Sequence, residues 1–170
     1  DIRNQKEKWS TLIDLGQCHT ELNDLQHAFD YFQEALWLSR DMANDKLEAK
    51  TIGNLGVTLL HMERFAEAIT LHKHELAILR QLGDYLAEGS ALINLSYGHR
   101  ELGELDKAIE LGQQAVKVFQ ACNDPIGEVH GLNALARAHL ESGKFDVAVQ
   151  HLHRALVIAR EVGDSKMQIE

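Results

Sequence analysis

Ten histidines are the residues of this chain whose chemistry could support metal binding. Zinc ligands converge on one point, so two histidines of one helix must be three or four residues apart to share an ion. His72 and His74, and likewise His151 and His153, are only two residues apart, which separates their rings by about 200° on a helix. His74-Glu75 is not followed by the second histidine of the zinc-protease motif. We therefore predict that these four histidines are surface residues and that the protein holds no metal and no cofactor.

Catalytic patterns are also absent from the sequence. The segment Ser142-Gly143-Lys144-Phe145 has part of a phosphate-binding loop but lacks its first glycine and its final Ser or Thr. No Ser-His-Asp or Cys-His set stands in a motif that would activate a nucleophile. We predict that the protein is not an enzyme and has no catalytic residues.

Composition restricts the fold and the partners. With 170 residues, a hydrophobic share of 45% and a single proline, the chain favours an all-α fold. A formal net charge of −9 argues against nucleic acid, whose binding depends on Lys and Arg at phosphates. No run of 18 apolar residues exists to enter a membrane, and two cysteines without metal-type spacing suit a reducing compartment. We expect a cytoplasmic protein without nucleic-acid or membrane partners.

The main signal is an internal repeat of 40 residues. Four sets of small or apolar residues recur at that spacing. They are Ala28, Ala68, Ala108 and Ala148; Leu15, Leu55, Leu95 and Leu135; Leu12, Ile52, Leu92 and Leu132; and Leu36, Leu76, Val116 and Leu156. Gly-Asp or Asn-Asp pairs separate the repeats, at 44–45, 83–84, 123–124 and 163–164. Each repeat is predicted to be a helix, a tight turn and a second helix.

These junctions define the predicted elements. Gly and Asn tolerate the left-handed conformation that ends a helix, and the following Asp can cap the next one. Asp45 with Glu48 forms a candidate capping box. The predicted helices are 3–21, 25–42, 46–62, 65–82, 85–102, 105–121, 125–142 and 145–162. We predict one array over 1–170 with repeats 1–43, 44–82, 83–122 and 123–162, and residues 163–170 as the start of a further helix in a longer natural protein.

The residues inside the repeat resemble the tetratricopeptide signature. The matching positions are Leu12, Leu15-Gly16, Ala28, Phe32 and Ala35 in the first repeat, and Ile52, Leu55-Gly56, Phe65 and Ala68 in the second. The long repeat with Asn-Leu-Gly and Gly-Asp is most similar to LGN/Pins-type adaptors, and more distantly to rapsyn and kinesin light chain. This resemblance implies a right-handed superhelix, or α-solenoid, of four repeats whose first helices line a concave groove. It also implies that His19, His99 and His139 pack between paired helices with hydrogen-bonded rings.

A variable stripe on the first helix of each repeat is our candidate groove. The rows of Leu12 and Leu15 stay apolar in every repeat and are predicted to be buried, whereas the stripe at 3,4,3 spacing changes in kind. The predicted peptide-binding residues are Gln17, Lys50, Asn54, Val57, Ser90, Asn94, Tyr97, Arg100, His130, Asn133 and Arg137. The resemblance implies that Asn54 and Asn94 contact a ligand's main chain, although both could instead bond a neighbouring repeat.

The predicted function is an adaptor that binds a partner's protein or peptide segment in this groove. Lys50, Arg100 and Arg137 on the predicted inner face favour an acidic segment. Two alternatives remain open: a structural or self-associating spacer, and a ligand-sensing repeat of a larger signalling protein.

Overall fold

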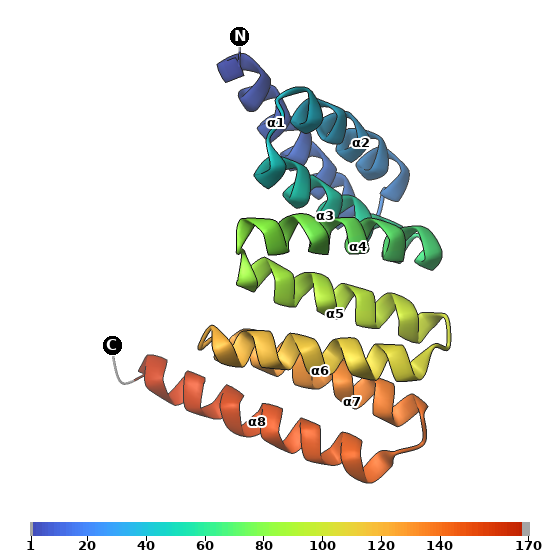
Figure 1. Cartoon of the computed structure of the whole chain (residues 1–170), viewed down its shortest axis with the longest axis vertical. Helices are drawn as coiled ribbons and strands as arrows, with labels where there is room; N and C mark the ends of the chain where they lie inside the picture. The colour runs from blue at the N-terminus through green and yellow to red at the C-terminus, as the bar shows by residue number, and fades with distance from the viewer. Residues whose placement is uncertain (1, 168–170) are drawn as a thin grey trace. The chain divides into compact units, whose positions relative to one another are not determined.

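The computed structural model describes residues 2–167, and these residues form α-helices without strands. The helices are α1 (Ile2–Glu21), α2 (Leu25–Asp41), α3 (Asp45–His61), α4 (Phe65–Leu82), α5 (Tyr85–Glu101), α6 (Leu105–Ala121), α7 (Pro125–Glu141) and α8 (Phe145–Met167) (Figure 1). The all-α prediction is confirmed, and every predicted boundary except the end of α8 lies within one residue of the observed one. None of the described helices combines the length and apolar content needed to cross a bilayer.

The chain divides into two compact units, Asp1–Leu82 and Gly83–Glu170. In the first unit α1 pairs with α2 and α3 with α4, and the two hairpins meet through α2 and α3. In the second unit α5 pairs with α6 and α7 with α8, and α7 packs against both α5 and α6. Each unit therefore consists of two helix-turn-helix repeats, and their union in one array over 1–170 stays a prediction.

Local backbone chemistry sets the helix ends. Gly83 and Asn123 adopt positive φ angles of 67° and 54°, as the junction chemistry predicts. The first junction differs, because Ala43 takes the left-handed conformation at φ 47° and Asn44, not Asp45, caps α3 by accepting a hydrogen bond from Leu47 N at 3.1 Å. The predicted cap at Asp45 was therefore one residue late, and the repeat keeps an unbroken 40-residue register at this position.

The predicted junction at 163–164 is not a junction. Helix α8 continues through Gly163 to Met167, so the described part of 163–170 extends α8 and does not start a further helix. Gly163 has no positive φ angle. A glycine permits the left-handed conformation without imposing it, and inside a helix it costs only about 1 kcal/mol relative to alanine. Residues 168–170 lie outside the described part of the chain.

In several pairs of helices, a glycine on one helix faces a large side chain on the next. Phe32 of α2 is 1% exposed, and a Cβ added to Gly16 of α1 would lie 2.4 Å from its ring. The predicted buried rows are confirmed except at Leu15, which is 38% exposed. In the first unit the core combines Trp9, Leu12, Phe32 and Ile52 with smaller side chains.

One histidine prediction was wrong. His72 is 0% exposed, and a Cβ added to Gly56 would lie 2.6 Å from its ring. Its Nδ1 lies 2.7 Å from Oε2 of Glu75, which is also buried. Helical spacing alone did not show that Gly56 leaves room for this ring. His74 and His153 are exposed as predicted, and His151 is half-buried.

The three histidines expected between paired helices all lie there. Nδ1 of His19 is 3.0 Å from Asp24 Oδ2, and Nδ1 of His99 is 2.7 Å from Glu104 Oε2. His139 is buried and stacks on His151 with ring centroids 5.3 Å apart, and its Nδ1 has no hydrogen-bond partner among the described residues. The predicted ring hydrogen bond is therefore confirmed for His19 and His99 but not for His139.

The His139–His151 stack predicts acid-sensitive stability. Burial, followed by the charges of His151 and Lys144, lowers the pKa of His139, and burial with Arg154 lowers the pKa of His151. Since both folded pKa values lie below the unfolded value of about 6.5, the unfolded chain binds more protons as the pH falls. We expect the melting temperature to drop between about pH 7 and 5.5.

The control variant for this prediction is His139→Tyr. It removes one of the two histidines that take up a proton on unfolding, so circular dichroism melts of the variant should depend less steeply on pH than those of the wild type. His27 acts in the opposite direction, because its hydrogen bond to Asp24 raises its pKa. The test is therefore the difference between the two proteins, and parallel pH profiles would contradict it.

Candidate functional site

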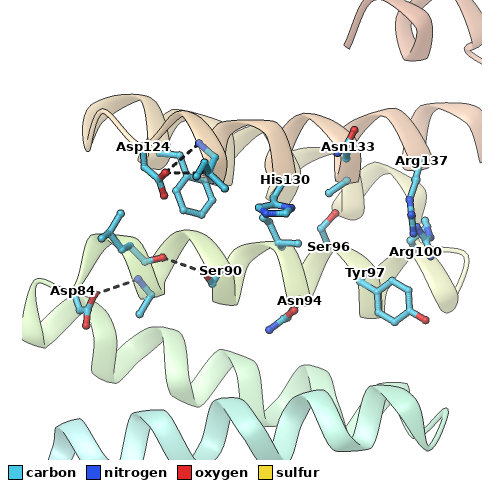
Figure 2. A pocket seen from close by; sticks show the side chains of 17 residues that line it. Asp84, Ser90, Asn94, Ser96, Tyr97, Arg100, Asp124, His130, Asn133 and Arg137 are labelled. Atoms are coloured by element: carbon cyan, nitrogen blue, oxygen red, sulfur yellow. Dashed lines mark hydrogen bonds between the residues drawn. The ribbon is translucent and has the colours of Figure 1, made fainter. Parts of the chain in front are cut away.

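The second unit contains a pocket of about 870 Å³ between α5 and α7 (Figure 2). Seven of the eleven predicted groove residues line it. From α5 they are Ser90, Asn94, Tyr97 and Arg100, and from α7 they are His130, Asn133 and Arg137. Helices α5 and α7 are the first helices of two consecutive repeats and lie 40 residues apart in the sequence, and the structure brings residues of both to one pocket.

The N-terminal caps of α5 and α7, and the packing of a glycine of α7 against a ring of α6, position these residues. Asp84 caps α5 by accepting a hydrogen bond from Ala87 N at 3.2 Å, and Asp124 caps α7 by accepting one from Gly127 N at 3.1 Å. A Cβ added to Gly127 would lie 2.1 Å from Phe119 of α6, so Gly127 lets α7 approach that ring. The same cap in both repeats starts α5 and α7 in the same register, and their variable stripes therefore face one pocket.

The cations of the pocket are not equivalent. Arg100 is mostly covered, pairs with Glu101, and has its Nε 3.1 Å from Glu141 Oε1. Its guanidinium carbon also lies 4.8 Å from the centre of the Tyr97 ring. Arg137 is exposed, and no described residue forms an ion pair with it. The predicted positive surface is therefore weaker than the sequence indicated, because two carboxylates offset Arg100.

Charge and apolar surface are distributed along the pocket. The cap carboxylates Asp84 and Asp124 lie toward one end, and Arg100 and Arg137 lie toward the other, with His130 between them (Figure 2). The pocket therefore has negative groups near the start of the two helices and positive groups near their ends.

Sequence reasoning missed the apolar part of the lining. Leu86 and Ile126 line the pocket and are about half exposed, and they occupy the same repeat position on α5 and α7. Lys46 stands at that position in the second repeat. An apolar residue where another repeat has lysine was the signal that could have identified them. Asp84 and Asp124 were recognised as caps but not as lining residues.

The other four predicted groove residues belong to the first unit. Gln17 lies exposed on α1, and Lys50 lies exposed on α3 with its Nζ 5.5 Å from the centre of the Trp9 ring. Asn54 and Val57 are half-buried on α3. The Nδ2 of Asn54 is buried without a hydrogen-bond partner among the described residues, so the predicted bond to a neighbouring repeat is not seen for this atom.

Comparison with protein families identifies the repeats. Three family models described as tetratricopeptide repeat match residues 10–41, 47–121 and 132–166, and together they cover most of the chain. No curated protein matches the sequence. The resemblance to LGN/Pins-type adaptors, rapsyn or kinesin light chain is not shown by these comparisons.

Solved structures show the same fold at low sequence identity. BtubC (BKLC) from P. vanneervenii is 18% identical with a TM-score of 0.80, over 91% of this chain and 64% of its own length. Aspartyl phosphate phosphatase F from Bacillus subtilis is 16% identical with a TM-score of 0.86, over 93% and 42%. A Rap protein complexed with Competence and Sporulation Factor is 20% identical with a TM-score of 0.84, over 94% and 44%. The chain thus spans less than two thirds of the length of each of these proteins. Because family models match its repeats and its helices form the corresponding hairpins, the chain belongs to the tetratricopeptide-repeat family.

Proposed function

We propose that the chain is a protein-interaction adaptor and that the pocket between α5 and α7 binds an extended segment of a partner protein. The observation that carries this proposal is that six predicted residues of the repeat-variable stripe, together with Asn94 beside it, line one pocket of about 870 Å³. That volume lies within the range of about 300–1,000 Å³ that is usual for ligand sites. The lining serines Ser90 and Ser96 donate their hydroxyl protons to the backbone oxygens of Leu86 and Ala108 and not to His130, which supports a non-catalytic role.

The chemistry of the lining defines the partner segment. Asn94 and Asn133 each provide a donor and an acceptor, which suit the main chain of an extended peptide. Leu86 and Ile126 offer apolar surface at the end where the helices start, and Tyr97 offers an aromatic face. Arg137 and His130 favour a carboxylate on the segment. The expected ligand is an extended peptide with an apolar residue at one end and Asp or Glu toward the other.

The partner can be sought with the whole chain as bait, followed by titration of the retained protein against variants. We expect Asn94→Ala, Tyr97→Ala and Arg137→Ala each to weaken binding, with losses of about 2 kcal/mol, or roughly 30-fold, where the residue is a hot spot. Arg100→Ala should also weaken binding, because its side chain contacts the Tyr97 ring. The Arg137 effect should shrink at high salt, which screens an exposed charge pair.

The matched control for Arg137 is Arg160→Ala, which removes an exposed arginine on α8 away from the pocket lining. Isothermal titration calorimetry measures the affinities, and far-UV circular dichroism verifies that each variant is folded. If the groove variants bind as tightly as Arg160→Ala, the assignment of this pocket is wrong.

Self-association is a second candidate, favoured by a different surface. Helix α8 exposes Phe145, Val149, Leu152 and Leu156 at 4,3,4 spacing, which forms one apolar stripe. Exposed apolar stripes of this kind favour protein contacts. Light scattering over a range of concentrations distinguishes the two functions: dimers that are lost in Leu152→Glu support the spacer, and a monomer that binds a partner through the pocket supports the adaptor.

A sensing role is the third candidate. One similar structure, the STAND protein PH0952 from Pyrococcus horikoshii, is described as having a tetratricopeptide repeat sensor, with 19% identity, a TM-score of 0.83, and coverage of 96% of this chain and 25% of that one. At this identity the similarity supports the fold alone. The pocket between α5 and α7 is the binding site under this candidate too, so titration with the retained ligand applies to both.

A further inference from the structure

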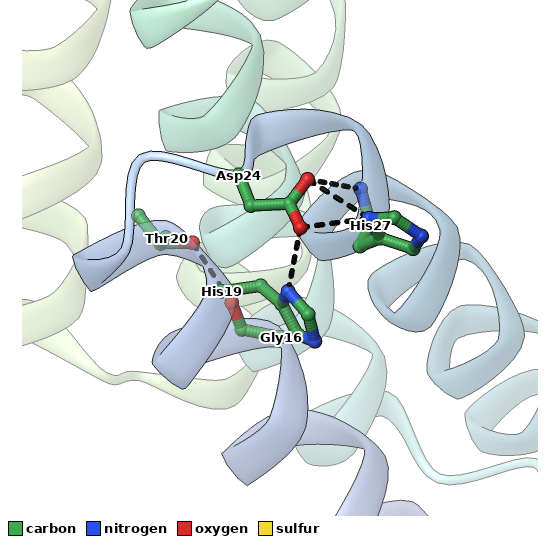
Figure 3. Close-up of polar contacts among 5 residues, drawn as sticks. All are labelled: Gly16, His19, Thr20, Asp24 and His27. Atoms are coloured by element: carbon green, nitrogen blue, oxygen red, sulfur yellow. Dashed lines mark hydrogen bonds and ion pairs between the residues drawn. The ribbon is translucent and has the colours of Figure 1, made fainter.

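Two histidines and an aspartate meet at the turn between α1 and α2, in the first unit (Figure 3). His19 lies in the last turn of α1, Asp24 caps α2, and His27 lies in the first turn of α2. Asn23 has a positive φ of 58°, and Asp24 N donates to the His19 carbonyl at 2.8 Å. This tight turn therefore fixes the distance between His19 and the first residues of α2.

The potential metal-binding atoms converge on one carboxylate. Nδ1 of His19 lies 3.0 Å from Asp24 Oδ2, and Nδ1 of His27 lies 2.7 Å from the same oxygen. One ligand atom from each of the three residues lies within 4.8 Å of the others. Ligand atoms about 2 Å from a tetrahedral zinc ion are about 3.3 Å from each other, so small side-chain rotations would bring all three to one ion.

We propose that His19, Asp24 and His27 form a binding site for a divalent transition-metal ion such as Zn²⁺. Two imidazoles and one carboxylate are a ligand set that zinc accepts, and water can complete its coordination. On binding, each ring offers the lone pair of its Nδ1 to the ion, so a neutral ring carries its proton on Nε2 and an imidazolium releases one proton to solvent. The site is separate from the pocket between α5 and α7, so it extends the function of the chain beyond the proposed adaptor role.

Contacts with neighbouring groups hold the side chains of this site in place. The His19 ring packs against the Tyr31 ring at a centroid distance of 5.3 Å and against the His27 ring at 5.2 Å, which restricts its rotation. The backbone N–H of His27 donates to Asp24 Oδ1 at 3.5 Å, so the helix cap holds the carboxylate beside the two rings. His27 is 64% exposed, which leaves the site open to solvent ions.

The third repeat provides an internal comparison. Its equivalent residues, 80 positions further on, are His99, Glu104 and Lys107. Glu104 Oε2 lies 2.7 Å from His99 Nδ1 and 2.9 Å from Lys107 Nζ, so the same turn arrangement recurs with an ammonium in place of the second imidazole. A charged lysine cannot bind a cation. The contact between a histidine and the carboxylate at this turn therefore occurs in both the first and the third repeat. His27 is the residue that makes the first repeat suited to a metal.

The test is isothermal titration calorimetry of the 170-residue chain with zinc chloride. We expect one tight site per chain, and we expect His19→Gln and His27→Gln each to weaken it by at least about tenfold, since even changes to groups around metal ligands cost about 10–100-fold. Asp24→Asn should also weaken zinc binding while keeping the helix cap, because asparagine caps as well as aspartate. His74→Gln, which removes an exposed histidine of α4, is the matched control and should bind zinc as the wild type does.

Two further measurements make the result decisive. Far-UV circular dichroism shows whether each variant keeps its helices, and zinc should raise the melting temperature of the wild type and of His74→Gln but not that of His27→Gln. The proposal is overturned if zinc does not bind the wild type, or if folded His19→Gln or His27→Gln binds zinc as tightly as His74→Gln does.

Discussion

Replacing Phe32 with alanine is expected to lower the free energy of unfolding by about 3–5 kcal/mol. The Phe32 ring is 1% exposed and occupies the space that Gly16 leaves on α1, so its removal opens a cavity between α1 and α2. Since whole domains are stable by only about 5–15 kcal/mol, this loss is large. Urea denaturation followed by circular dichroism measures it, and Phe145→Ala, at a position 63% exposed, should cost far less.

Gly16→Ala tests whether glycine and phenylalanine act as a pair. In the wild type the added methyl would lie 2.4 Å from the Phe32 ring, so this substitution should also destabilise the protein. In the Phe32→Ala background the same methyl enters the new cavity and should cost little. A double-mutant cycle then gives a coupling energy of about 1 kcal/mol or more, whereas additive effects would contradict the packing argument.

Glu75→Ala is expected to destabilise the protein by about 3 kcal/mol. Glu75 and His72, both on α4, form a buried hydrogen-bonded pair that packs against glycines of α3, and loss of the carboxylate leaves the His72 ring buried without that partner. Gln substituted for Glu75 retains an acceptor for the ring nitrogen and should cost less. Urea denaturation at pH 7 compares the two variants, and equal losses would show that packing rather than the pair is responsible.

The double substitution His72→Phe with Glu75→Ala provides the stronger test. It gives the second repeat the residues Phe and Ala that the first repeat has at Phe32 and Ala35. A buried polar pair replaced by well-packed apolar residues is often neutral or stabilising by about 1–4 kcal/mol, and Gly56 leaves room for the ring as Gly16 does. We therefore expect the double variant to be at least as stable as the wild type, although Glu75→Ala alone is not. A double variant as unstable as the single one would refute this explanation.

The amino-acid sequence by itself determined the helices and the helix face on which the variable stripe lies. Left-handed residues such as Gly83 and Asn123, and caps such as Asp84 and Asp124, act on the backbone next to them, so helix ends can be predicted without knowing the fold. The stripe of Ser90, Ile93, Tyr97 and Arg100 follows from the helical period and from comparison between repeats. These features depend on residues that are close together in the chain, so the sequence contains the information that determines them.

The tertiary structure alone decided which side chains meet across helices. The sequence predicts that His72 is a surface residue, but Gly56 of the neighbouring helix leaves room for its ring in the interior. The sequence also predicts that Arg100 is available to a ligand, but the Glu141 carboxylate lies beside it. His19 and His27 are eight residues apart on two different helices, so no helical spacing predicts that they meet, and the turn at Asn23 brings them together. Contacts of this kind depend on how helices turn and pack, and no helical period within one segment encodes them.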